Sequence, residues 1–205
     1  MPAGLLVGDF GIAQQRHDLT EMSDSTGATA TRLLGPPRWR LSMSAPQSGL
    51  SRTQAALWQT MLLQLRGGVN HLAAWDIVAV APRGTMRGTL TLNGATTAGQ
   101  SAAISITGGA GQASTTLLAG DWLQIGSGLT GQLVKVVTDA TANGSGVISV
   151  TVEPPLRTAY SGGTAVAWDK PLGHYKILSA SSGWTYIPGN NLLQGFAADF
   201  LEQWT

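Results

Sequence analysis

The side chains that most often perform chemistry in proteins are scarce in this chain. Its three histidines, His17, His71 and His174, do not stand four residues apart, the spacing by which one helix presents two metal ligands. The chain has no cysteine, which excludes disulfides, thiol nucleophiles and cysteine-ligated zinc. We expect ordinary surface or hydrogen-bonded histidines, no metal site and no cofactor.

The carboxylates also lack a catalytic pattern. Asp9, Asp18, Glu21 and Asp24 lie near the N-terminus, but their spacing is not that of a Ca²⁺-binding loop, so we expect a solvated loop. No pair among the eleven acidic residues is marked for glycoside hydrolysis. The sequence supplies no catalytic set for an enzyme such as a cell-wall hydrolase, and we expect the protein not to be an enzyme.

One segment matches the glycine pattern of a dinucleotide-binding turn. Residues 126–131, GSGLTG, follow a predicted strand, but a dinucleotide site requires a helix next, whose N-terminus holds the pyrophosphate. The residues that follow, QLVKVV, are typical of a strand instead. We interpret the glycines as a tight turn between two strands.

The seven tryptophans are spread through the chain. Aromatic side chains beside glycine-rich loops can stack on sugars or bases, but a dispersed set is typical of core and interface positions. Trp39 and Trp58 fit core positions by their periodicity. The others lie in strand-like runs: Trp75, Trp122, Trp168, Trp184 and Trp204.

The first clear strand follows a proline pair. Residues 1–35 carry many glycines and a polar run, which predicts an extended, irregular arm with a loop. Residues 38–44 then alternate between two faces with the period of a strand. The core-facing side chains are Trp39, Leu41 and Met43, and the outward ones are Arg38, Arg40, Ser42 and Ser44.

A single strong helix comes next. Ser51 and Gln54 form a capping box at its start, and Gly67 stands where a left-handed residue ends a helix. The apolar residues recur with helical period and predict one buried stripe. The stripe consists of Leu57, Met61 and Leu65, widened by Trp58 and Leu62.

The rest of the chain predicts β structure. Residues 88–120 contain no charged side chain, although about a quarter of residues are charged in a typical domain, so this stretch favours packing against other protein. Apolar runs separated by glycine and asparagine turns predict strands, and residues 139–146 predict a hairpin loop. The predicted strands lie at residues 72–81, 90–92, 104–106, 121–125, 132–138, 147–152, 165–168, 175–179, 184–187 and 197–203.

These elements predict a mainly β fold with one flanking α-helix. We interpret residues 1–87 and 166–205 as one domain, into which residues 88–165 are inserted as a small β-barrel of about five strands. The strands on either side of the insertion then pair in one sheet. Strand and helix do not alternate, so a doubly wound parallel sheet is not expected.

Charge is unevenly divided along the chain. Residues 1–87 hold eight arginines and five acids, whereas the remainder holds four basic and six acidic residues. Arginine is the usual interface partner of carboxylates and phosphates. Arg38 and Arg40 are therefore candidates for a subunit interface with Asp199 or Glu202, or for the lining of a channel; simple solvation is the alternative.

Three longer stretches carry a resemblance to a known family. The first runs from RWRLSMSAPQSGLSRTQAALWQTMLLQLRGG into LAAWDIVAVAPRGTMRG, the second is AGDWLQIGSGLTGQLVKVVTDATANGSGVISVTVEPPLR, and the third is GFAADFLEQW. Together they cover most of residues 30–205. In pattern they resemble distal tail and related baseplate-hub proteins of long-tailed bacteriophages.

The resemblance implies a tail-tube-like β-sandwich with a flanking helix, six copies of which form a ring under the tail tube. It implies contacts with the tail tube protein and with baseplate-hub or tail-tip proteins, a lumen through which DNA passes, and a place in the virion. The insertion here is shorter than the carbohydrate-binding-like domain of some members, so direct receptor binding is not implied.

Two other classes of function stay open. A binding module would hold a host glycan or single-stranded nucleic acid on the barrel, which requires clustered aromatics and arginines, and Arg157 and Trp122 alone hardly provide them. An enzyme requires the catalytic set that the sequence lacks. The net charge of +1 gives no overall nucleic-acid footprint. No apolar run spans a bilayer and no signal peptide is recognisable, so we expect synthesis in the host cytoplasm and no membrane insertion.

Overall fold

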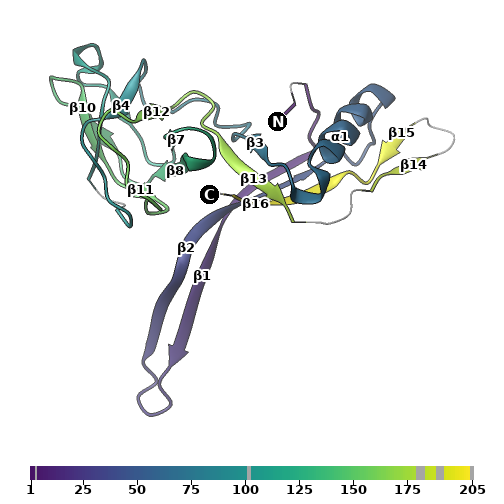
Figure 1. Cartoon of the computed structure of the whole chain (residues 1–205), viewed down its shortest axis with the longest axis horizontal. Coiled ribbons are helices and arrows are strands. Elements are labelled where there is room, and N and C mark those ends of the chain that lie inside the picture. The colour runs from purple at the N-terminus through teal and green to yellow at the C-terminus, as the bar shows by residue number, and fades with distance from the viewer. Residues whose placement is uncertain (3, 101–102, 179–182, 188–191, 204–205) are drawn as a thin grey trace.

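The structure is a computed structural model that describes residues 1–2, 4–100, 103–178, 183–187 and 192–203. It is mainly β, as the sequence predicts, with one α-helix and two larger sheets among the described residues. Figure 1 shows two lobes side by side, with a two-stranded arm that projects away from both. Trp204, at the end of the last predicted strand, lies outside the described residues.

A five-stranded antiparallel sheet organises the first lobe. In spatial order its strands are β1 (Asp9–Met22), β2 (Thr29–Ser44), β16 (Ala197–Glu202), β13 (Gly173–Ile177) and β3 (Leu72–Ala74). β3 and β13, which flank the second lobe in the sequence, pair with each other, as predicted. The strand predicted to reach residue 81 ends at Ala74, because the carboxylate of Asp76 accepts the N–H groups of Val78 and Ala79 and turns the chain.

The helix α1 (Arg52–Gln64) packs against one face of this sheet. Its N-cap is Ser51, whose hydroxyl accepts the N–H of Gln54, as the capping box predicts. Four of the five residues of the predicted stripe are buried, but Leu57 is only half-buried, and Ala55 is buried instead. The helix and its C-cap contribute Ala55, Trp58, Met61, Leu62 and Leu65 to the core.

The end of the helix lies close to the predicted position. Leu65 is the C-cap, and Gly67 has a φ of 62°, in the left-handed region that favours glycine. Arg66, just before it, also has a positive φ, of 47°. The short 3₁₀ turns of the chain lie at Arg66–Gly68, Ala110–Gln112 and Gly128–Thr130.

The second lobe is a nearly closed, barrel-like sheet of seven strands, two more than predicted. In spatial order they are β10 (Val147–Val150), β5 (Ile104–Thr107), β4 (Leu90–Leu92), β12 (Ala165–Ala167), β7 (Trp122–Ile125), β8 (Gln132–Val136) and β11 (Val152–Glu153). β12 pairs with both β4 and β7, so this sheet extends to Ala167. Two small pairs complete the strands: β6 (Thr116–Leu117) with β9 (Ala140–Thr141), and β14 (Thr185–Ile187) with β15 (Leu192–Gln194).

The glycine pattern at residues 126–131 is a turn between antiparallel strands, as predicted. It joins β7 to β8, and strand β8 begins at Gln132, where a dinucleotide site would need a helix. Gly126 has a φ of 78°, and a Cβ atom there would lie 3.1 Å from the ring of Tyr160. The glycine therefore serves the turn and its packing.

The predicted hairpin loop at residues 139–146 is more complex than expected. It contains β9, and the strand that pairs with β8 is not β10, which directly follows the loop, but β11, whose Val152 lies opposite Val136. β10 pairs instead with β5. The chain thus uses this loop to pass from one part of the barrel-like sheet to another.

Residues 1–35 were predicted to be an irregular, extended arm with a loop. The extended arm and its loop are present, but from Asp9 onward the chain belongs to a long β-hairpin. β1 and β2 pair antiparallel over nearly their whole length, and the turn is closed by a bond from the N–H of Ser23 to the carbonyl of Ala28. The glycines conceal this strand in the sequence. At one of them, Gly11, a Cβ atom would lie 3.0 Å from Oγ of Ser42, a tight contact that a small shift of the serine side chain would relieve.

Candidate functional site: assembly surfaces and the junction between the lobes

One face of the five-stranded sheet has no covering element within the described part of the chain. The core and α1 lie against its other face, so the alternate side chains point away from them. We name this surface the open face, and an antiparallel sheet can leave such a face in water or offer it to a partner. Its central residues are Gly11, Ala13, Arg38, Arg40, Ser42, Ser44, Ala197, Asp199 and Leu201.

Two of the predicted interface residues meet on the open face of a single chain. Nη2 of Arg40 lies 3.2 Å from Oδ2 of Asp199, and both side chains are 48% exposed. They are neighbours because Ser42 lies opposite Asp199 in the pairing of β2 with β16. An ion pair this exposed contributes about 0–1 kcal/mol, so either partner can turn to another chain at little cost.

Glu202 is not available for a subunit contact, which corrects the prediction for this residue. Its carboxylate is 2% exposed, and Oε1 lies 2.9 Å from Nη1 of Arg157. Oε2 accepts the backbone N–H of Trp39 at 3.1 Å. Glu202 stands three residues after Asp199, so strand alternation places the two on opposite faces of the sheet.

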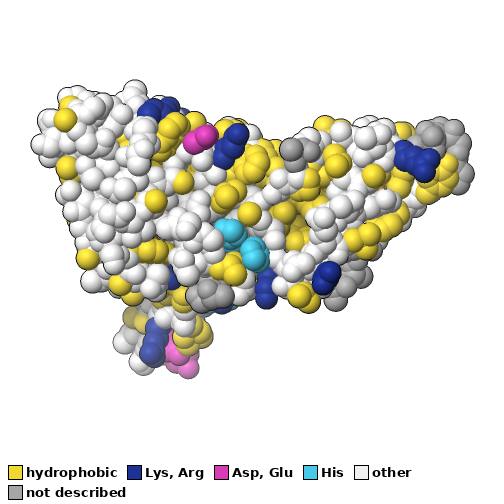
Figure 2. Space-filling model, turned by 45° about the horizontal axis from the view of Figure 1, so that its top comes forward, with side chains coloured by type: hydrophobic (Ala, Val, Ile, Leu, Met, Phe, Trp, Pro, Cys, Tyr) yellow, Lys and Arg dark blue, Asp and Glu magenta, His cyan; other side chains and the backbone are white. Residues whose placement is uncertain are grey.

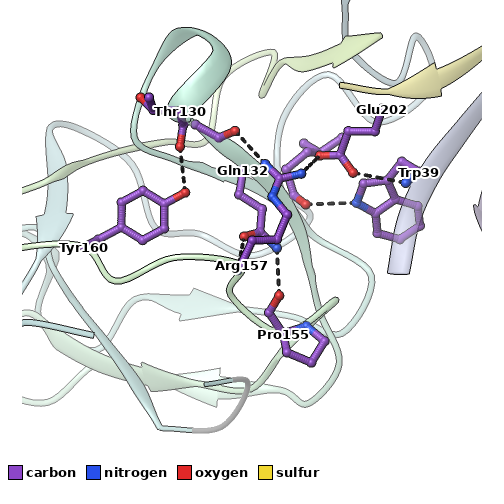
Figure 3. A network of polar contacts seen from close by, with 9 residues as sticks. Trp39, Thr130, Gln132, Pro155, Arg157, Tyr160 and Glu202 are labelled. Atoms are coloured by element: carbon purple, nitrogen blue, oxygen red, sulfur yellow. Dashed lines mark hydrogen bonds and ion pairs between the residues drawn. The ribbon is translucent and has the colours of Figure 1, made fainter. Parts of the chain in front are cut away.

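Arg157 lies at the centre of a network that joins the two lobes (Figure 3). Besides Glu202, it binds the carbonyl of Gly131 through Nη2 at 3.0 Å, and its backbone N–H binds Oε1 of Gln132 at 2.8 Å. Gln132 in turn donates to the carbonyl of Pro155 at 2.9 Å. We name this region the junction, and its residues are Trp39, Trp122, Gln132, Leu133, Arg157 and Glu202.

The apolar part of the junction is a pair of tryptophans from the two lobes. Trp39 and Trp122 meet edge to face, with ring centres 4.7 Å apart, and Nε1 of Trp39 donates to the carbonyl of Leu133 at 2.9 Å. Nε1 of Trp122 donates to Asp76 at 3.0 Å, and Nζ of Lys135 lies 4.5 Å from the centre of its ring. Each indole thus fills apolar space and still satisfies its N–H.

Burial dominates the electrostatics of the junction. It raises the pKa of Glu202 above the usual range, although the charge of Arg157, the N–H of Trp39 and the charge of Arg38 favour the ionised form. Burial also raises the pKa of Tyr160, whose hydroxyl donates to the carbonyl of Thr130. Separating the partners of a buried ion pair leaves uncompensated charges, so moving the lobes apart at the junction is unfavourable.

The two residues proposed for a ligand-binding face of the barrel are both used in the junction. Trp122 is 4% exposed, and the guanidinium of Arg157 is 8% exposed. Trp168, another tryptophan of the second lobe, donates to the carbonyl of Gly88 and lies beneath Arg87. Trp122 and Arg157 therefore present no free face to a glycan or a base.

The arm is the most exposed part of the molecule. Every residue from 16 to 34 is exposed, and the arm extends away from both lobes (Figure 1). A two-stranded hairpin alone is at best marginally stable in water, and several exposed apolar side chains on it make the arm a candidate contact surface. The large apolar side chains are Leu19, Met22, Leu33 and Leu34, from 42% to 66% exposed.

The N-terminal carboxylates do not gather into a cation site. Asp9 accepts the hydroxyl of Ser44 at 2.9 Å, and Asp18 pairs with Arg16 at 2.8 Å. All four acids are spread along β1 and the turn that follows it. Within the described ranges, no group of three or more His, Asp or Glu side chains is arranged to hold a metal ion.

Two of the three histidines lie next to each other, which the sequence did not predict. His17 lies on the arm, at a shift in the register of β1 and β2. His71 and His174, 103 positions apart in the sequence, meet with their ring centres 5.3 Å apart. Sequence spacing gave no sign of this pair, because only the pairing of β3 with β13 brings it together.

A scan against protein-family models finds none that matches the chain, and a search of curated proteins finds no match either. No helix in the described part of the chain is long and apolar enough to cross a membrane. The residues that sequence reasoning missed are Arg157, as the buried partner of Glu202, and the four apolar side chains of the arm. The adjacent pair Leu33-Leu34, in an otherwise polar stretch, is the signal that could have indicated the exposed apolar surface of the arm.

Proposed function

We propose that this chain is a non-enzymatic structural subunit that assembles with copies of itself into a closed ring of six at the distal end of a bacteriophage tail. The phage setting comes from the resemblance of its sequence pattern to distal tail and baseplate-hub proteins. In that setting the ring joins the tail tube protein to baseplate-hub or tail-tip proteins, within the virion, and DNA passes through its lumen.

The arm is the observation that carries the proposal. Residues 16–34 are exposed throughout and include Leu19, Met22, Leu33 and Leu34, so a lone chain leaves this apolar surface in water. A neighbouring copy that received the arm would bury it. Because an arm and its receiving surface are different parts of the chain, such a contact is heterologous, and heterologous contacts close into rings when the rotation allows.

The open face is compatible with the same assembly. Its small side chains, such as Gly11, Ala13 and Ser42, let another backbone approach closely, and Arg40 and Asp199 form only an exposed pair. The junction meanwhile holds the second lobe fixed against the first through Arg157. A subunit of this kind brings both lobes into a ring in one defined orientation.

Native mass spectrometry of the purified chain tests the proposal. We expect one discrete oligomer, of six copies, for the wild type. The double variant Met22→Ser/Leu34→Ser should stay folded by circular dichroism but remain monomeric. Val78→Ser is the matched control, because Val78 is an equally apolar side chain, 88% exposed, outside the arm.

Two results would contradict the proposal. One is a wild type that remains monomeric at all concentrations up to the limit of solubility. The other is an arm variant that assembles as fully as Val78→Ser, because the arm would then have no part in the contact. Oligomers of six in the wild type and control, with monomers in the arm variant, support it.

A further inference from the structure

Two histidines that are distant in the sequence stand side by side where the two lobes are connected. His71 directly precedes β3, and His174 lies in β13, opposite Ala73. Their ring planes cross at 65°, and Figure 2 shows histidine side chains next to each other at the surface. β3 leads the chain toward the second lobe and β13 leads it back. One histidine therefore lies beside each of the two segments that connect the lobes.

One ring nitrogen of this pair has no partner. Nδ1 of His174 is enclosed and makes no hydrogen bond within the described part of the chain. Buried polar atoms are normally satisfied, and an unpaired one costs about 1–3 kcal/mol. Burial, and secondly the neighbouring His71, lower the pKa of His174.

The separation of the rings matches two ligands of one tetrahedral metal ion. In such a site the Zn–N bond is about 2.05 Å and the ring centre lies about 1.15 Å beyond the nitrogen, so each centre is about 3.2 Å from the metal. An N–Zn–N angle of about 109° then separates the ring centres by about 5.2 Å. The observed separation of His71 and His174 is 5.3 Å.

Other arrangements fit less well. Two ligands at the right angle of an octahedral site would place the ring centres about 4.5 Å apart, with the same bond lengths. A T-shaped contact between two neutral rings also occurs near the observed separation. That contact alone leaves Nδ1 of His174 unsatisfied, whereas a metal ion held by this nitrogen satisfies it.

We propose that His71 and His174 bind one divalent transition-metal ion, with zinc as the best-fitting ion and water completing its coordination. No third His, Asp or Glu joins them in a ligand group among the described residues, so the protein supplies two of the ligands. Imidazole nitrogen selects zinc, nickel or copper over magnesium and calcium. The bound ion ties the strand that leaves the first lobe to the strand that returns to it.

Zinc titration of the full chain by calorimetry at pH 7.5 tests this site. Three variants are compared: His71→Ala, His174→Ala and the matched control His17→Ala, whose histidine lies on the arm. We expect one zinc ion per chain in the wild type and in the control. Each of the other two variants should bind at least about tenfold more weakly, a loss of about 1.4 kcal/mol.

Thermal unfolding and pH supply independent readouts. Zinc chloride should raise the Tm of the wild type and of His17→Ala, because an ion that binds only the folded state stabilises it, and should raise the Tm of the other two by less. Binding should weaken from pH 7.5 to pH 5.5, since protons compete for both imidazoles.

Three outcomes would overturn the assignment. They are no saturable zinc binding in the wild type, undiminished binding in both His71→Ala and His174→Ala, or an equal loss in His17→Ala. His71 is exposed, so its variant carries the test even if His174→Ala fails to fold. The result is independent of ring formation, because the titration can be run on the monomeric arm variant.

Discussion

The strand β2 passes through two different surroundings, and the contrast shows what each part of the molecule depends on. Near its end, Trp39, Leu41 and Met43 are buried in the core of the first lobe. Near its start, residues 29–34 are exposed on every side. Both parts pair with β1, but only the buried part also pairs with β16, so the arm lacks a second neighbouring strand as well as a core. The buried part is secured by its own chain, whereas the arm gains burial only from a partner.

The junction and the arm extend this contrast to charged groups. In the junction, Arg157 and Glu202 are almost completely removed from water and bind each other. On the arm, Arg16 and Asp18 pair in an exposed position. An exposed pair contributes about 0–1 kcal/mol, whereas breaking a buried pair leaves an uncompensated charge. Substitutions should therefore affect stability in the junction and assembly on the arm.

The largest effect is expected from Arg157→Leu. It leaves Glu202 buried without its partner, and removing one member of a buried pair typically costs about 3–5 kcal/mol. The double variant Arg157→Leu/Glu202→Leu should recover most of that loss, because it buries no charge. Urea unfolding of both variants measures the difference. Equal destabilisation in the two would show that the junction depends on packing or on the other bonds of Arg157.

The same variant should show a distinct pH dependence. Without Arg157, the folded-state pKa of Glu202 moves further above its unfolded value than burial already holds it. A group with a raised folded pKa loses stability as pH rises from the unfolded pKa through the folded one. The penalty of Arg157→Leu should therefore be larger at pH 8 than at pH 5. A penalty that is independent of pH would mean that Glu202 is not ionised in the wild type.

The helix offers a second comparison of buried and half-buried positions. Met61→Ala should lower the free energy of unfolding by about 2–5 kcal/mol, as expected for a fully buried side chain, since Met61 is 2% exposed. Leu57→Ala should lower it by less, because Leu57 is half-buried. Thermal or urea unfolding measures both. If Leu57→Ala lowers the free energy of unfolding more than Met61→Ala does, Leu57 belongs to the centre of the buried stripe, as the sequence alone predicts.

Several elements could be predicted because their signals are local. The alternation of residues 38–44, the capping box at Ser51 and the glycine turn at residues 126–131 are all confirmed. Each depends on residues within a few positions of one another. The stripe of α1 is confirmed except at Leu57, which is only half-buried, whereas Ala55 is buried.

The candidate surfaces were harder to predict because they depend on distant pairing. Arg157 meets Glu202, and His71 meets His174, only after the two sheets have formed. The arm was predicted as an extended segment with a loop, but its two strands were missed for another reason. It has no core of its own, so its strands lack the regular alternation of buried and exposed side chains by which β1 could have been recognised.

Proteolysis should show whether the arm, unlike the buried part of β2, depends on a partner for its protection. We expect Leu33→Ser to change the free energy of unfolding of the monomer by less than about 0.5 kcal/mol, as for other exposed positions. We also expect trypsin to cut the monomer after Arg16 or Arg32 on the arm, and assembly to protect both sites. Mass spectrometry of timed digests follows the cleavage. Equal cleavage in oligomer and monomer would show that the arm remains exposed after assembly.

The smallest effect on stability is expected on the open face. Arg40→Glu breaks an exposed pair with Asp199, so the free energy of unfolding should change by at most about 1 kcal/mol. Its effect on assembly distinguishes two roles for Arg40. If Arg40 acts only within its own chain, the exchange Arg40→Asp/Asp199→Arg should restore the assembly that Arg40→Glu weakens. If Arg40 contacts a neighbouring subunit, the exchange leaves a reversed charge at that contact and assembly stays weak. We expect the second result in native mass spectra, and full assembly of Arg40→Glu would remove Arg40 from the subunit contact.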